Sequence, residues 1–86
     1  MNLVRLDFKF REYALPAQRE RVVDEVRKLG AERVEAMFPD ETDVELASLY
    51  KAEGIPDGQS SQVLSKLDKL PEVEFAEQTP VRKLIR

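Results

Sequence analysis

Acidic side chains are the most numerous groups in this sequence that could do chemistry, and several of them gather in two short clusters. One cluster follows Pro39 and the other occupies residues 72–77. Grouped carboxylates can bind calcium, but a calcium loop places its oxygen ligands at alternate positions around a glycine. Neither cluster has that spacing. We therefore expect solvated surface acids at both: Asp40, Glu41, Asp43, Glu72, Glu74 and Glu77.

The other residue types that catalysis commonly uses are missing or isolated. The chain has no histidine and no cysteine, which removes the usual acid/base group at neutral pH and the thiolate nucleophile. Nothing in the sequence brings Tyr13 and Lys51 together as an acid/base pair. An acylphosphatase-like site needs a catalytic asparagine, and the only one here is Asn2. We therefore expect no catalytic residue, no metal site and no cofactor, and we predict that the protein is not an enzyme.

Length and charge narrow the class of protein further. The 86 residues suffice for one small domain, which on folding buries roughly 60–65% of the surface of its unfolded chain. With 14 basic and 17 acidic residues, the chain lacks the positive field of a protein that binds nucleic acid. No apolar run reaches the length of a membrane span, and no signal peptide is visible. We expect no nucleic-acid or membrane partner, and a cytoplasmic location unless the chain belongs to a secreted precursor.

The first part of the chain predicts a strand followed by a helix. Apolar and charged residues alternate from Val4 to Arg11, which is the period of a strand with one buried face. Its charged row should lie on an open, solvated face: Arg5, Asp7, Lys9 and Arg11. Pro16 suits a first helical turn, and apolar residues recur at helical spacing as far as Gly30, so we expect a helix over residues 16–29.

The middle of the chain predicts two strands joined by a loop. Residues 33–38 contain apolar side chains and are followed by Pro39 and several acids, which favour a turn. Residues 44–52 resume with residues that are compatible with a strand. Helix competes over residues 33–52 because Glu, Ala, Leu and Met are common there, but Pro39 argues against one continuous helix. The glycines and the proline of residues 53–58 predict the next loop.

The last third predicts a helix and a final strand. Ser60 or Ser61 can cap a helix whose apolar stripe runs as far as Leu70. Pro71 ends this helix, and Val73 begins a strand.

The resulting order, β-α-β-β-α-β, predicts an α+β fold of the ferredoxin-like type, with two helices on one face of a four-stranded antiparallel sheet. The crossovers place the first and third strands at the centre. Residues 1–80 should form this domain and residues 81–86 an extended tail. Phe8 and Phe10 share the inward face of the first strand, so the exposed aromatics of an RNA-recognition domain are missing, with Tyr50 the only candidate.

The residues after the second predicted helix resemble a motif of subtilisin propeptides. The run LPEVEFAE at residues 70–77 is similar to the succession of Leu, Pro, Val, an aromatic, an apolar residue and Glu that leads that family into its last strand. The element order over nearly the whole chain is also that of these propeptides and of related stand-alone inhibitors. The resemblance implies a non-enzymatic inhibitor or intramolecular chaperone whose partner is a subtilisin-like serine protease, encoded in cis or in trans.

The resemblance also implies how such a protein binds. In the family, the open sheet face packs on two protease helices, and acids just after the last strand cap the starts of those helices. Glu77 matches a capping position, while Thr79 stands where a second acid is common and offers only a neutral hydroxyl. The tail lies in the active-site cleft like a cleaved product, which here concerns Val81, Arg82, Lys83, Leu84, Ile85 and Arg86.

The residue in the primary pocket decides which protease is implied. With Arg86 there, the protease accepts a basic residue; with Ile85 there, it prefers an apolar one.

Other interpretations stay open at the level of the sequence. Glu77 can be a solvated surface acid, and the tail can be a continuing strand, an edge-pairing segment or a frayed terminus. The charged row of the first strand is less apolar than the docking face usual in the family, although Lys and Arg stems can cover a partner surface. The alternative function is a ferredoxin-like interaction or regulatory module that acts as a homodimer, since this architecture hosts many functions.

Overall fold

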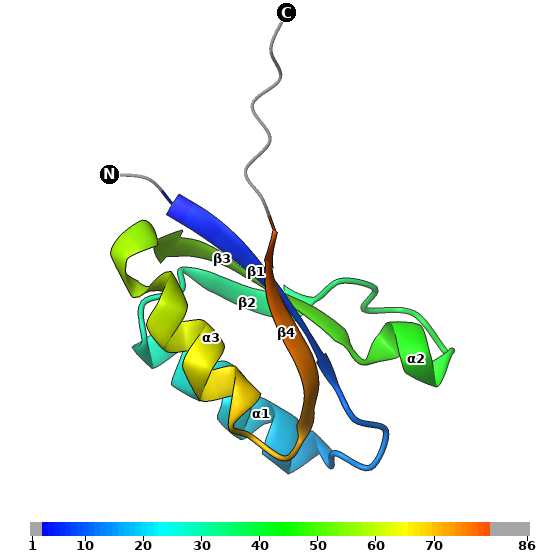
Figure 1. The fold of residues 1–86 in the computed structure, drawn as a ribbon. Coiled ribbons are helices and arrows are strands. Elements are labelled where there is room, and N and C mark those ends of the chain that lie inside the picture. The colour runs from blue at the N-terminus through cyan, green and yellow to red at the C-terminus, as the bar shows by residue number, and fades with distance from the viewer. Residues whose placement is uncertain (1–2, 80–86) are drawn as a thin grey trace, which may run out of the picture.

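The computed structural model describes residues 3–79. Its elements are β1 Leu3–Phe10, α1 Pro16–Lys28, β2 Arg33–Ala36, α2 Val44–Ala47, β3 Leu49–Pro56, the 3-10 turn η1 Asp57–Gln59, α3 Ser60–Asp68 and β4 Val73–Thr79. The strands form one antiparallel sheet in the order β2-β3-β1-β4, and α1 and α3 lie on one face of it (Figure 1). The α+β, ferredoxin-like expectation is confirmed, with β1 and β3 at the centre and with α2 and η1 added.

The core lies between the sheet and the two long helices. The inward side chains of β1 are fully buried at Leu6, Phe8 and Phe10, and the two phenylalanine rings meet edge to face with centroids 5.4 Å apart. Tyr50 on β3 is half-buried on the same side, and its ring stacks on that of Phe8 at 5.7 Å. The notion of an exposed aromatic at Tyr50 is therefore wrong, because the residue completes this aromatic cluster.

Helix α1 has nearly the bounds that the sequence predicts. Pro16 is its first residue, and the side-chain oxygen of Gln18 accepts a hydrogen bond from the N–H of Leu15 at 2.8 Å. Gly30 follows the helix with a φ of +123°, a conformation that other residues rarely adopt. Val22 and Val26 face the core, so the predicted apolar spacing is confirmed.

The expected strand over residues 44–52 is wrong at its start. Asp43 accepts hydrogen bonds from the N–H groups of Glu45 and Leu46, at 2.8 Å and 3.4 Å. This cap stabilises the one-turn helix α2 where we expected a strand. The strand itself begins at Leu49 and continues to Pro56, so residues 53–56 do not form the predicted loop.

A bulge allows β3 to continue through its glycine. Val4 pairs with Ile55 and Leu6 with Ala52, which leaves two residues of β3 opposite Arg5. One of the two is Gly54, with a φ of +73°. Glycine inside a strand often marks such a bulge.

Helix α3 begins at Ser60 but not by the expected serine cap. The Ser60 hydroxyl donates to the carbonyl of Asp57 at 3.0 Å, back into η1, and Gln59 is the N-cap without a side-chain hydrogen bond. The α-helix ends at Asp68, and the N–H of Leu70 still bonds the carbonyl of Leu67 at 3.1 Å before Pro71. Among residues 3–79, no helix has the length and apolar character needed to cross a membrane.

Candidate functional site

The sheet face opposite α1 and α3 is the candidate site, and strand register decides which side chains share it. Near one end of the sheet a row crosses three strands: Phe75, Lys9 and Leu49. The next row crosses all four strands: Glu77, Asp7, Lys51 and Glu35. Beyond it, backbone pairing joins Arg5 to Thr79 and Arg33 to Glu53. The open face is therefore mainly charged, with apolar side chains in the row of Phe75 and Leu49 and at Leu3, which is 49% exposed.

Most charges of this face find partners within the chain. The ion pairs, with their nitrogen-to-oxygen distances, are Arg5–Asp7 at 2.8 Å, Lys51–Glu35 at 3.5 Å and Arg33–Glu53 at 4.0 Å. Each of these pairs has at least one partner that is well exposed to solvent, so each contributes on the order of 1 kcal/mol or less to stability. Their main effect is to neutralise the central part of the face.

Glu77 is the exception on this face. It is exposed, and no ion pair or side-chain hydrogen bond engages it within residues 3–79. Its cross-strand neighbour is Asp7, a like charge that disfavours the pairing. Asp7 is compensated by Arg5, whereas Glu77 presents its carboxylate outward from the edge strand.

Glu77 and Thr79 do not follow the last strand, as the resemblance implies, but lie within it. β4 extends to Thr79 because β1 offers backbone partners as far as Arg5. The motif at residues 70–77 therefore enters an edge strand of the sheet, and Glu77 holds a fixed position on its open face. Phe75, two residues earlier on the same face, is 40% exposed.

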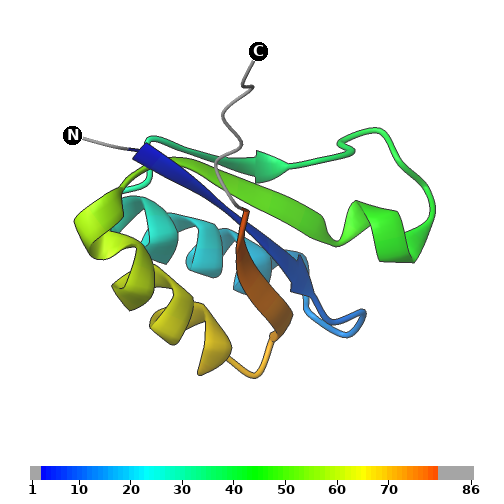
Figure 2. The same ribbon diagram turned by 45° about the horizontal axis from the view of Figure 1, so that its top comes forward.

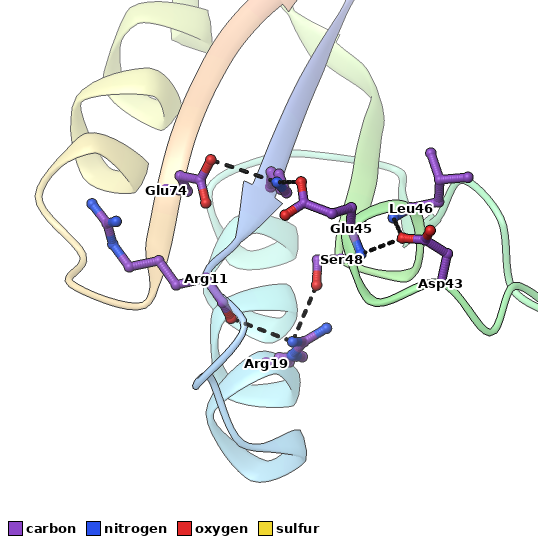
Figure 3. Close-up of polar contacts among 8 residues, drawn as sticks. Arg11, Arg19, Asp43, Glu45, Leu46, Ser48 and Glu74 are labelled. Carbon is purple, nitrogen blue, oxygen red and sulfur yellow. Dashed lines mark hydrogen bonds and ion pairs between the residues drawn. The ribbon is translucent and has the colours of Figure 1, made fainter.

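Lys9 departs from the expectation of a solvated charged row. Its side chain is only 9% exposed, and its amine pairs with Glu45 of α2 and, at 3.5 Å, with Glu74 of β4. Figure 3 shows these two carboxylates approaching from opposite sides. The hydrogen bond with Glu45 raises the pKa of Lys9 above 10.5, the charges of Glu45 and Glu74 act in the same direction, and burial opposes them. No short-range pattern predicts this contact because Glu45 lies 36 positions along the chain.

Arg11 and Tyr13 both bind the turn before β4. Arg11 lies beyond the end of β1, and its Nε donates to the carbonyl of Pro71 at 3.2 Å, while the Tyr13 hydroxyl donates to the same carbonyl at 2.8 Å. Lys51, the imagined acid/base partner of Tyr13, is paired with Glu35 instead. These contacts join the loop before α1 to the turn before β4.

The helix side of the molecule holds a groove of about 720 Å³ between α1 and strands β2 and β3. Its Arg19 donates to the carbonyl of Ala14 at 3.0 Å and to the Ser48 hydroxyl at 3.3 Å, and its guanidinium lies 5.3 Å from the centre of the Phe10 ring. Figure 3 shows the hydrogen bonds that join Arg19 to Arg11 and to Ser48. The contacts of Arg19 fasten α1 to the start of β3, so we assign the groove no chemistry. In the described part of the chain, no group of three His, Cys, Asp or Glu side chains could hold a metal ion.

The predicted tail at residues 81–86 lies outside the described residues, as does Asn2. Comparisons with protein-family models, curated proteins and solved structures found no match for this chain.

Proposed function

We propose that this chain is a non-enzymatic inhibitor or folding chaperone of a subtilisin-like serine protease. It docks through the open face of its sheet and places residues 81–86 in the active-site cleft as a cleaved product would lie. This mechanism requires no catalytic residue, metal or cofactor in the chain itself.

Glu77 carries the proposal. It is the exposed carboxylate of this face that no cation of residues 3–79 neutralises, and it stands at the outer edge of the sheet. The first turn of a helix has N–H groups without partners and a positive dipole end, so a carboxylate placed there is favourable. Glu77 is suited to accept such hydrogen bonds from a protease helix, and Phe75 offers an apolar contact beside it.

The interface would gain its affinity from the surface buried between the two proteins and from main-chain hydrogen bonds. A protease–inhibitor interface of standard size buries about 1,600 Å² in total. An extended tail adds hydrogen bonds to a strand edge of the protease, and alternate side chains enter its subsites. The internal ion pairs balance most charges of the face, so removing these charges from water costs less than removing unpaired ones.

The first test measures inhibition of a panel of subtilisin-like proteases, including one that prefers basic residues, by the full chain and by a version that ends at Thr79. We expect the full chain to inhibit at least one member, and the truncated chain to lose inhibition while keeping its circular dichroism spectrum. Full inhibition by the truncated chain would contradict the role of the tail. No inhibition of any member by a folded, undigested chain would contradict the proposed function.

The second test addresses the docking face by Glu77→Gln. The variant keeps the shape of the side chain and removes its charge, so hydrogen bonds to a helix start become weaker. We expect the inhibition constant to rise about tenfold, the effect of losing a charge-assisted hydrogen bond. The matched control is Glu20→Gln, an exposed acid of α1 on the other side of the sheet, which should not change inhibition. Equal constants for all three proteins would exclude Glu77 from the interface.

A further inference from the structure

The segment between β2 and β3, residues 37–48, extends away from the body of the domain, and we call it the α2 arm (Figure 2). Its large apolar side chains are unusually exposed: Phe38 by 44%, Val44 by 49% and Leu46 by 39%. Helix α2 buries none of its residues. Packing within the domain therefore does not explain why the arm carries these side chains.

The arm is nevertheless held at its base. The N–H of Met37 bonds the carbonyl of Leu49 at 3.0 Å, and the N–H of Phe10 bonds the carbonyl of Ser48 at 2.9 Å. The pairing of Glu45 with Lys9 joins α2 to β1. A four-residue helix has little stability of its own. The domain thus fixes α2 while leaving Val44 and Leu46 uncovered.

The charge of the arm is uniform in sign. It contains Asp40, Glu41, Asp43 and Glu45 and no Lys or Arg. The Asp43 carboxylate caps α2, and the Glu45 carboxylate pairs with the amine of Lys9. Asp40 lies exposed on the connection. An exposed apolar surface bordered by negative charge is complementary to an apolar surface bordered by Lys and Arg.

The arm also continues the open face. Glu45 contacts Lys9, whose cross-strand neighbours on that face are Phe75 and Leu49. A partner seated on the row of Phe75 therefore lies next to the start of the arm. One partner surface can reach both.

We infer that the α2 arm is a second contact element for the protease that receives Glu77, and that Val44 and Leu46 pack on an apolar protease surface bordered by basic side chains. This inference depends on the proposed function and specifies the partner surface. Unlike the tail, the arm would contact the protease outside the active-site cleft.

The test combines Val44→Ser and Leu46→Ser and measures inhibition of a panel protease that the unaltered chain inhibits. We expect the inhibition constant to rise about tenfold, mainly through faster dissociation, with only a small change in melting temperature because both side chains are partly exposed and outside the core. The matched control is Leu15→Ser, an apolar residue 62% exposed just before α1, which should leave inhibition unchanged.

The outcomes separate this inference from the proposed function. If Glu77→Gln weakens inhibition and the double variant does not, the arm is excluded and the docking face stands. If the unaltered chain inhibits no panel member, both fall.

The sign of the partner charge is tested by Asp40→Lys. We expect association with the same protease to slow, and the difference to shrink at high salt, since steering by exposed charges is screened. Faster or unchanged association would contradict the inference that basic side chains border the partner surface.

Discussion

The amine of Lys9 lies between two carboxylates at the end of the open face, and this position couples its charge to stability. A lysine with a side chain only 9% exposed would normally have a lowered pKa, because burial disfavours the charged form. The hydrogen bond with Glu45 outweighs burial, and the charges of Glu45 and Glu74 add to it, so the pKa is raised. Lys9 therefore stays charged at neutral pH and holds α2 against the sheet.

The raised pKa predicts a loss of stability in alkali. The folded state binds the Lys9 proton more tightly than the unfolded state, whose pKa is near 10.5. The contribution is therefore complete below that pH and is lost as the pH rises through the folded pKa. Glu45→Gln removes the largest cause of the shift, so as the pH rises above 10.5 the variant should lose less stability than the unaltered chain.

Urea unfolding followed by circular dichroism measures this difference. Glu20→Gln is the control and should follow the unaltered chain. The same pH dependence for Glu45→Gln as for the unaltered chain would contradict the role of Glu45.

At the scale of elements, β3 depends on the glycine within its bulge. A Cβ atom at Gly54 would lie 2.7 Å from the Cβ of Glu32, and its φ of +73° is unfavourable for other residues. We expect Gly54→Ala to lower the free energy of unfolding by about 1–3 kcal/mol, which lowers the melting temperature by about 4–8 °C per kcal/mol in a domain of this size.

Gly58→Ala is the matched control for this prediction. A Cβ at Gly58 meets nothing within 4 Å, so the change in the free energy of unfolding should stay within about 0.5 kcal/mol. Equal melting temperatures for the two alanine variants would show that the bulge does not need glycine.

Elements with a repeated pattern were predictable from the sequence. The alternation of β1 and the helical spacing of α1 each extend over several repeats, so single residues do not change the interpretation. The end of β3 was not predictable in this way, because Gly54 and Pro56 suggest a loop although they form a bulge and a strand end. Helix α2 is shorter than two helical turns. The local signals for it were the Glu, Leu and Ala residues that made helix a competitor over residues 33–52, and Asp43, a residue type that favours helix caps.

The candidate site was predictable only in part, for a similar reason. Glu77 and its strand follow from a local motif, and the structure adds that no cation of residues 3–79 pairs with this carboxylate. The burial of Lys9 depends on α2 reaching across from a distant part of the sequence, and no local pattern reports such a contact.

The whole molecule is asymmetric in what its two sheet faces do. One face joins α1 and α3 and holds the buried aromatic and aliphatic side chains, which supply most of the stability. The other face pairs most of its charges internally and leaves Glu77, Phe75 and the α2 arm outward. The proposed binding determinants are thus separate from the core, so we expect that exposed residues such as Glu77, Val44 and Leu46 can be changed with little effect on folding.

The edge strand β4 has features that discourage association between copies of the chain. Lys9 pairs with Phe75 while Phe10 pairs with Val73, so Glu74 is the extra residue of a bulge in β4. Bulges and charged side chains on an edge strand discourage pairing with another copy. Glu74 and Glu77 would approach their counterparts if two β4 strands paired antiparallel, and like charges there are unfavourable.

We therefore expect the full chain to be a monomer in light scattering at the concentrations of the inhibition assay, because its free edge carries a bulge and two acids. The double variant Glu74→Gln and Glu77→Gln should associate more readily if these acids are what keeps copies apart. A stable dimer of the unaltered chain that persists on dilution would contradict this expectation. It would favour the homodimeric interaction module instead, since a partner copy would occupy the edge or open face that the protease is proposed to contact.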